Sequence, residues 1–577
     1  MSKNYVFNTV PRIYYRRSVQ DLSHGHLTTG NVGDLIPFYI QEVYPGDSMK
    51  GHGTVVCRTT TPFIKPVFGN LFVDMMYFFV PTRLIVNDVG RLFGENTSGA
   101  WAPDSTPAVQ PVVAPNSGSG VVKHSIANYL GWPTRVKSTS TQNGVSVLPF
   151  RAFALIYNDW FRDENLVPPI DIKKGWSGDT GNIELPPLIN GNAFSASNYL
   201  GLVPKVSKVH DYFTSCLPAP QKGEASSIPI ELSLGYLPVI TRAATVSNAN
   251  LVPMQLDSLG GTFVTNSFYD FSLRGSSALG SGNQGQMYAG GNPVTLSGNF
   301  YGVKPTNLWT DASSIDNAGS LSVNDLRFST AVQRILERSA RGGSRYVEYI
   351  RQAFGTEPGD VRMQRPEYLG GSRNPISVQQ VTQTTGSSEE NNTLAELGAF
   401  SLSSGHAKFN KGFTEHGYII GVMCVRYFHT YSQGLERFWS RLSRYDFYDP
   451  AFAHLSEQPV YQSEIFFDGN NAGGSNRKIF GYNEPYADLR FRPNRISGQF
   501  TESGSGLNIW SFFDEYTSAP VLSQSFIEET STYVDRCLSS PSTTIDNFMF
   551  DIWTDCKAVR VLPARGVPGL VDHLGNQ

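Results

Sequence analysis

The sequence has little charge and few cysteines for its length. Charged residues make up 16% of the 577 residues, where about 25% is usual. The net charge is −3, whereas a nucleic-acid-binding domain usually has a large positive excess, so any contact with nucleic acid must be local. No CxxC pair occurs, which favours buried thiols in a reducing compartment. The five cysteines are Cys57, Cys216, Cys424, Cys537 and Cys556.

Long apolar segments are also missing. The longest apolar runs, Leu71–Val80 and Tyr418–Val425, fall well short of the roughly 18–20 residues that cross a bilayer. The first residues, Met1-Ser2-Lys3-Asn4, do not resemble a signal peptide. We therefore expect a protein that is made and assembled in a cytoplasm, with no membrane step.

Recognisable catalytic patterns are absent as well. There is no GK dipeptide for a phosphate-binding loop, no HExxH and no GxSxG. His24 and His26 lie close together but in a Ser/Gly context, which disfavours metal ligation, and the pair Glu528-Glu529 predicts a solvated face. These absences favour a structural protein over an enzyme, with no cofactor.

Aromatic residues, glycine and proline are abundant, with 36 Phe, 27 Tyr, 55 Gly and 35 Pro. Aromatic side chains suit strands, and glycine and proline suit the turns between them. Leu71–Val80 has two apolar faces interrupted at Asp74, which predicts a strand packed on both sides. Without βα alternation or repeats, the pattern favours a mainly β sandwich or jelly roll. The other predicted strands are Asn31–Tyr44, Gly53–Arg58, Tyr418–Phe428, Val460–Phe467 and Phe548–Leu562.

Helices are few, and two segments stand apart from the strands. Helical spacing predicts helices at Pro149–Glu164, Asn324–Phe354 and Gly434–Tyr445, and Gly342-Gly343 break or kink the second. Residues 1–30 are predicted to be a basic arm, with four basic residues (Lys3, Arg12, Arg16 and Arg17) against Asp21. Ser258–Asn324 is rich in Gly, Ser and Asn, and its interspersed aromatics favour a long surface insertion over a flexible interdomain linker.

Two groups of arginines are candidate nucleic-acid-binding residues. Arginines beside aromatic rings suit sequence-tolerant single-strand binding, because guanidinium groups follow phosphates and rings stack on bases. The alternative for both groups is salt bridging within or between subunits, as in the i,i+4 pair Glu337–Arg341. The first group would share one stripe of an unbroken helix and consists of Arg334, Arg338, Arg341 and Arg345. The second lies among Phe438, Trp439 and Tyr445 and consists of Arg437, Arg441 and Arg444.

Several segments together resemble one known family. They are Asp34–Pro37, Glu42–Asp47, Tyr77–Leu84, Asp211–Pro218, Leu336–Tyr346 and Gln364–Gly371. With them the chain resembles the major capsid proteins of microviruses (Microviridae), closest to the gokushovirus branch. The resemblance extends over nearly the whole chain and is poor only over Pro229–Asn324.

The resemblance implies a single capsid domain over residues 1–577, built on an eight-stranded antiparallel jelly roll with long loop insertions. It implies sixty copies in a T=1 icosahedral shell around a circular single-stranded DNA genome. Residues 230–324 would be a variable surface insertion that forms a protrusion at the threefold axes, with Ser258–Asn324 as the candidate receptor-binding stretch. Implied partners are copies of itself, the packaged DNA, a small basic DNA-binding protein, an internal scaffolding protein, a pilot protein and a bacterial surface receptor.

Two other classes of protein remain open from the sequence. The aromatic-rich insertion would also suit a glycan-binding or glycan-degrading β-sandwich, such as a phage spike. A sequence-tolerant single-strand-binding protein is less favoured, because the net charge is negative.

Overall fold

The computed structural model places most of the chain in two compact units. Unit 1 consists of Met1–Gly223 and Leu336–Gln577, and unit 2 is Glu224–Ile335. The described residues are 17–93, 121–134, 145–175, 193–195, 199–224, 323–357, 359–384, 395–452, 455–469, 477–501 and 506–562, together with short strands between residues 112 and 310.

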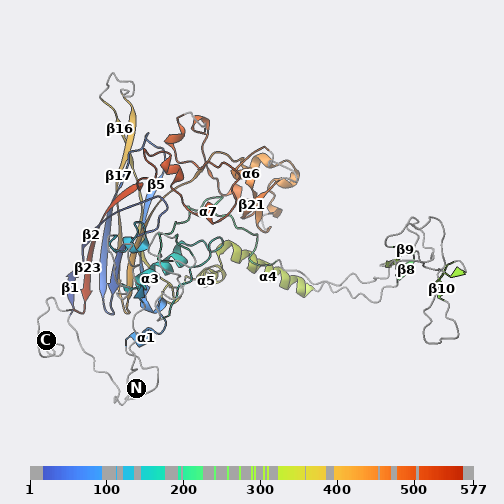
Figure 1. The fold of residues 1–577 in the computed structure, drawn as a ribbon, viewed down its shortest axis with the longest axis horizontal. Helices are drawn as coiled ribbons and strands as arrows, with labels where there is room; N and C mark the ends of the chain where they lie inside the picture. The colour runs from blue at the N-terminus through green and yellow to red at the C-terminus, as the bar shows by residue number, and fades with distance from the viewer. Residues whose placement is uncertain are drawn as a thin grey trace, which may run out of the picture. The chain divides into compact units, whose positions relative to one another are not determined.

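Unit 1 is built on two antiparallel sheets (Figure 1). The larger sheet has the strand order β1-β23-β4-β17-β16, and β2 also pairs with β23. Its strands are β1 (Ser18–Asp21), β2 (His24–Gly30), β4 (Ser48–Thr59), β16 (Val378–Thr382), β17 (Leu397–Gly412) and β23 (Phe548–Arg560). The smaller sheet has the order β15-β5-β18-β3, with β3 (Ile36–Val43), β5 (Leu71–Pro81), β15 (Glu367–Pro375) and β18 (Gly417–Tyr427).

The chain passes repeatedly between the two sheets. It goes from β2 in the larger sheet to β3 in the smaller, back to β4, across to β5 and β15, and then through β17 and β18 to β23. The mainly β class is therefore confirmed, and this order of eight antiparallel strands is consistent with a jelly roll.

Aromatic rings fill the space between the sheets. Tyr77 on β5 lies 4.8 Å, ring centroid to centroid, from Phe409 on β17, and the Tyr39 hydroxyl on β3 donates to Cys556 Sγ on β23. Gly53 on β4 makes room for this packing, since a β-carbon there would lie 2.1 Å from the Tyr77 hydroxyl oxygen. Large rings thus require a glycine on the strand that faces them.

The outer faces of the two sheets differ. β5 and β18 are buried on nearly every residue, so both of their faces are covered. Helix α3 (Leu148–Ile156) and the π-helical turn η2 (Tyr157–Phe161) pack on the smaller sheet, where Trp160 lies 5.3 Å from Phe78. Along β4, β17 and β23 buried and exposed residues alternate instead, so the outer face of the larger sheet is open.

A smaller core lies between the segment 199–224 and the loops that follow β18. It is built from buried aromatic and aliphatic side chains, including Phe213, Val460, Phe480 and Ile527. The pairs β20-β21 and β19-β22 lie in this part. The elements are β19 (Thr430–Tyr431), β20 (Gln458–Tyr461), α6 (Gln462–Ile465), β21 (Ile479–Asn483), β22 (Asn494–Arg495), α7 (Gln524–Ile527), α8 (Thr532–Asp535) and the 3₁₀ turns η5 (Arg437–Ser440), η6 (Arg444–Asp446), η7 (Pro450–Phe452), η9 (Ala487–Leu489), η10 (Gly498–Thr501) and η11 (Asn508–Trp510).

Unit 2 contains short antiparallel strand pairs. β10, β11 and β12 form one ladder, and β9 pairs with β13 and β8 with β14. Their bounds are β8 (Val239–Thr241), β9 (Leu256–Ser258), β10 (Ser272–Leu273), β11 (Met287–Ala289), β12 (Asn292–Pro293), β13 (Val303–Pro305) and β14 (Leu308–Thr310). The rest of the candidate stretch Ser258–Asn324, up to the start of α4 (Val323–Gly342), lies outside the described residues.

The remaining elements of unit 1 are short, except for α5. They are η1 (Thr82–Leu84), α1 (Val89–Leu92), β6 (Val112–Val113), α2 (Ile126–Tyr129), β7 (Val145–Ser146) and α5 (Tyr346–Phe354). Three predicted strands, Leu71–Val80, Tyr418–Phe428 and Phe548–Leu562, are confirmed as β5, β18 and β23. The predicted break at Gly342-Gly343 is confirmed as well, because Gly343 has φ of +90° and separates α4 from α5.

Other predictions were wrong in part. The predicted basic arm does not extend to residue 30, because Ser18–Asp21 and His24–Gly30 pair with β23; residues 1–16 lie outside the described residues. Val460–Phe467 is a strand only to Tyr461 and then turns into α6. Gly434–Tyr445 is no helix, since it holds the 3₁₀ turn η5 and the start of η6. Tertiary contacts in the small core override its helical pattern.

Candidate functional site

A cavity of about 520 Å³ in unit 1 brings together distant parts of the sequence. Thr214–Leu217, and Ala340–Gly343 with Arg345, come from two of the segments that resemble the microvirus family and line it. The η2 turn contributes Trp160, and β18 contributes Arg426. Two of the candidate nucleic-acid-binding arginines, Arg341 and Arg345, therefore line the same cavity.

The arginines at this cavity already have partners. Arg345 caps α5 and donates from Nη2 to the carbonyl oxygen of Asn158 at 2.8 Å. Arg341 Nε donates to Glu457 Oε1 at 2.8 Å. Glu164 accepts from Lys222 Nζ at 2.6 Å and from the Ser344 amide at 2.8 Å; burial works against its charge, but these contacts lower the pKa of its carboxyl. Salt bridging, the alternative considered from the sequence, is thus present here.

The first arginine group is divided by the helix break. Arg334 and Arg338 lie on α4, and Arg338 lies over the Tyr349 ring at 6.0 Å. Arg345 does not lie on the same face of α4 as these two arginines, because the positive φ of Gly343 ends the helical conformation before Arg345. Arg334 is exposed and has no carboxylate partner among the described residues.

The second group lies on the short turns over the small core. Arg437 Nη1 donates to the Pro459 carbonyl oxygen at 2.8 Å and lies 3.7 Å from Glu464 Oε1. Burial raises the pKa of the Glu464 carboxyl, although Arg437 opposes this effect. Arg441 forms an ion pair with Asp488. Arg444 is exposed, and no described carboxylate pairs with it.

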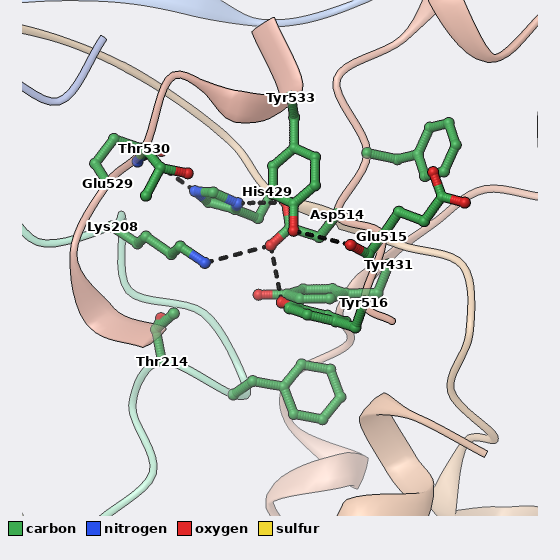
Figure 2. Close-up of polar contacts among 12 residues, drawn as sticks. Lys208, Thr214, His429, Tyr431, Asp514, Glu515, Tyr516, Glu529, Thr530 and Tyr533 are labelled. Atoms are coloured by element: carbon green, nitrogen blue, oxygen red, sulfur yellow. Dashed lines mark hydrogen bonds and ion pairs between the residues drawn. The ribbon is translucent and has the colours of Figure 1, made fainter. Parts of the chain in front are cut away.

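A buried polar cluster lies beside the small core (Figure 2). Figure 2 shows His429 between two carboxylates, with Nδ1 2.8 Å from Asp514 Oδ1 and Nε2 3.1 Å from Glu529 Oε2. Lys208 Nζ lies 3.3 Å from Asp514 Oδ2, and the Tyr516 hydroxyl donates to the same oxygen. The cluster joins the end of β18 to three loops. The prediction of a solvated face at Glu528-Glu529 is wrong for Glu529, because Glu529 has no exposed surface.

The protonation states in this cluster follow from its charges. Burial opposes protonation of His429, but Asp514 and Glu529 outweigh it and raise the pKa of His429 to about 9. Burial likewise opposes ionisation of Asp514, but His429 and Lys208 hold the pKa of its carboxyl below its usual range. Two cations therefore balance two carboxylates inside the protein. The sequence contained no local signal for this cluster, since its members are up to 321 positions apart, from Lys208 to Glu529.

Two kinds of reactive site, metal centres and accessible cysteine thiolates, are not found among the described residues. None of their His, Cys, Asp and Glu side chains form a group of three that could hold a metal ion. All five cysteines are buried and free, as predicted, and burial raises the pKa of the Cys57 and Cys216 thiols, so these are not reactive thiolates. No helix in the described part of the chain is both long and apolar enough to span a membrane.

The two sheets of unit 1 define an antiparallel β-sandwich. The family described as capsid protein (F protein) matches residues 8–570. The chain is 36% identical over 561 residues to capsid protein VP1 of Spiroplasma virus 4, covering 96% of this chain and 95% of that protein. It is 35% identical to capsid protein VP1 of Chlamydia phage 1, covering 98% and 97%, and 33% identical to that of Bdellovibrio phage phiMH2K, covering 97% of each.

The chain belongs to the major capsid proteins of microviruses, in the gokushovirus branch, and its place is the virion. Its relatives are structural proteins of single-stranded DNA phages. A glycan-binding or glycan-degrading spike, considered from the sequence, is not favoured by these comparisons.

Proposed function

We propose that sixty copies of this protein form a closed T=1 shell around a circular single-stranded DNA genome. The observation that carries the proposal is an exposed aromatic surface in unit 1, made of residues on the loops 438–455 and 489–491. Leu442 is 86% exposed, Tyr445 73% and Trp439 63%. Exposed apolar surface of this extent marks an interaction site, and aromatic side chains are typical anchors of interfaces between proteins. The other large exposed side chains there are Phe438, Phe447, Tyr448, Leu455, Leu489 and Phe491.

A second copy of the chain is the proposed occupant of this surface. Coat proteins repeat one interface many times, so each contact needs only modest affinity in a closed shell. The ion pairs Arg437–Glu464 and Arg441–Asp488 involve the chain neighbours of Phe438 and Leu442. They would hold the turns that present the aromatic surface in one conformation.

Electron microscopy of the purified assembly tests the proposal. We expect closed particles of uniform small diameter that contain DNA, because the exposed aromatic surface is buried only when copies associate. Monomers at every concentration, or trimeric fibres, would contradict it. A variant with Trp439→Ser and Leu442→Ser should keep the monomer's thermal stability and lose the closed particles.

We further propose that unit 2 contributes to host attachment, through the stretch Ser258–Asn324. Its short ladders and its low charge suit a surface insertion. Replacing Ser258–Asn324 by a short Gly/Ser linker should leave closed particles and abolish adsorption to host cells, measured as the fraction of particles bound. If the shortened chain forms no particles, the stretch is structural and this part of the proposal fails.

Contact of the two arginine groups with the genome also stays a proposal. Arg334 and Arg444 are its best-placed members, because they are exposed and not already paired with a described carboxylate. The remaining partners that the family resemblance implies are proposed as well: a small basic DNA-binding protein, an internal scaffolding protein, a pilot protein and a bacterial surface receptor. A separate basic protein is compatible with the slightly negative net charge of this chain.

A further inference from the structure

The outer face of the larger sheet carries an unusual set of side chains. On β4 and β17, strands that pair directly, the exposed residues include five basic side chains and no acidic one. They are Lys50, His52 and Arg58 on β4, and His406 and Lys408 on β17. From Lys50 to Arg58 the strip is about 27 Å long, at roughly 3.4 Å per residue.

Two lysines of this face repel each other in the isolated sheet. Lys50 stands directly opposite Lys557 of β23 in the register, and like charges in that position are destabilising. None of Lys50, Lys408 and Lys557 forms an ion pair with another residue in the described ranges. The exposed carboxylates of this face lie on β23 and β1 and not on the strip itself: Asp555 stands opposite His52, Asp551 opposite Val56, and Asp21 opposite Lys557 in the register.

An exposed tryptophan lies beside the basic strip. Trp553 on β23 stands opposite Thr54 of β4 and is 56% exposed. On its other side the register places Gly25 of β2, and Trp553 Cε3 lies 3.5 Å from where a β-carbon would stand on that glycine. Because glycine has no side chain, nothing on β2 covers the indole at this position.

We propose that this outer face of β4, β17 and β23 binds single-stranded nucleic acid. The basic side chains would contact phosphates along the strip, and the Trp553 indole would stack on a base. This is the combination that sequence-tolerant single-strand binding uses. The inference rests on the proposed function, since the packaged genome is then the strand in contact.

A second copy of the chain is the competing occupant, and the composition of the face disfavours it. Lysine is depleted in interfaces between proteins, and this face holds three lysines without ion-pair partners in the described ranges. A phosphate backbone would relieve the Lys50–Lys557 repulsion, whereas an identical basic face would add to it. The aromatic surface of the 438–455 and 489–491 loops, by contrast, has the composition of a contact between copies.

Equilibrium binding of a fluorescent thirty-nucleotide oligothymidylate to the full-length chain, measured by anisotropy at increasing salt, tests the inference. Lys50→Gln with Lys408→Gln should lower the slope of log affinity against log salt by roughly 1.4, because each contact to a single-strand phosphate contributes about 0.7. Trp553→Ala should lower affinity about 5- to 150-fold, which corresponds to loss of one stacked base. Matched controls are Lys123→Gln with Lys174→Gln, two exposed lysines elsewhere, and Trp510→Ala.

The outcomes separate the inference from the proposed function. Losses confined to the face variants support the inference, and thermal melting of each variant shows that it is folded. If the face variants bind like the wild-type chain, the inference is overturned. The same holds if they keep full affinity but form no closed particles, since the face is then a contact between copies. Failure of the wild-type chain to form particles would contradict the proposed function alone, because binding of the oligonucleotide is measured on unassembled chains.

Discussion

Replacing Asp74 by asparagine is expected to destabilise unit 1 by about 3 kcal/mol. Asp74 is 4% exposed in the centre of β5. Arg373 of the neighbouring β15 donates to both of its carboxylate oxygens, at 2.8 and 3.0 Å. Arg426 of β18, on the other side, donates to Oδ2. One carboxylate thus links three strands of the smaller sheet.

The magnitude follows from what the substitution leaves behind. Removing one member of a buried ion pair typically costs about 3–5 kcal/mol, because the remaining charge is desolvated without compensation. We expect a cost at the lower end of this range, because the Arg373 side chain is 46% exposed and can be solvated once Asp74 is replaced. Arg426, at 18%, is the group that would be left without a partner.

Urea denaturation of the full-length chain measures this effect. Asp551→Asn is the matched control, because Asp551 is an exposed aspartate in a strand of the other sheet. The control should stay within about 0.5 kcal/mol of the wild-type free energy of unfolding. A similar value for Asp74→Asn would show that the Arg–Asp–Arg ladder does not stabilise the fold.

The free energy of unfolding is also expected to fall by roughly 3 kcal/mol as the pH rises through about 9, because His429 then loses its proton. The folded-state pKa of His429 is about 9, against an ordinary value of 6.5. A raised pKa means that the folded protein holds the proton more tightly than the unfolded chain. This stabilisation is fully present below pH 6.5, and it is lost progressively between pH 6.5 and 9.

The groups around His429 explain why its pKa is raised and why stability falls as the pH rises. Asp514 and Glu529 accept from its two ring nitrogens, and Lys208 faces Asp514. Without the imidazolium charge, Asp514 would still pair with Lys208 and Glu529 would still interact with Arg426, but both buried carboxylates would lose the cation that lies between them. The Tyr427 ring also packs on the imidazole, at 4.4 Å between ring centroids.

The variant His429→Gln separates this histidine from other groups that titrate near pH 9. Its free energy of unfolding at pH 6 should be lower by roughly 3 kcal/mol, and the decline between pH 6.5 and 9 should be smaller by that amount. His210→Gln, at an exposed histidine, is the control and should keep the wild-type profile. An unchanged pH profile in His429→Gln would rule out the imidazolium as the source.

Strand prediction from the sequence succeeded where the local pattern was strong. β5, β18 and β23 combine aromatic and β-branched residues over ten or more positions, which suits buried strands. β17 was missed, because its inward positions include small residues such as Ala399, Ser401 and Gly405, which have weak strand preference. At Gly405 the small residue is needed for packing against β15, because a β-carbon there would lie 2.5 Å from Asn374 Cγ.

The candidate arginines show the same limit. Spacing alone put Arg345 on one stripe with Arg334, but the positive φ of Gly343 separates them. Arg437 and Arg441 stood among aromatic residues in the sequence, yet they pair with Glu464 and Asp488, which come from later segments of the chain. Whether an arginine is available to a ligand depends on which carboxylates the fold brings near it, and that information is non-local.

By itself, the sequence determined the mainly β class, the buried thiols and the resemblance to microvirus capsid proteins, because composition and local motifs are properties of neighbouring residues. Only the tertiary structure decided which charges are paired, that Glu529 lies inside the protein beside His429, and that the basic residues of β4 and β17 gather on one open sheet face. These outcomes depend on strand register and on contacts between segments hundreds of residues apart, where burial and charge compensation act together.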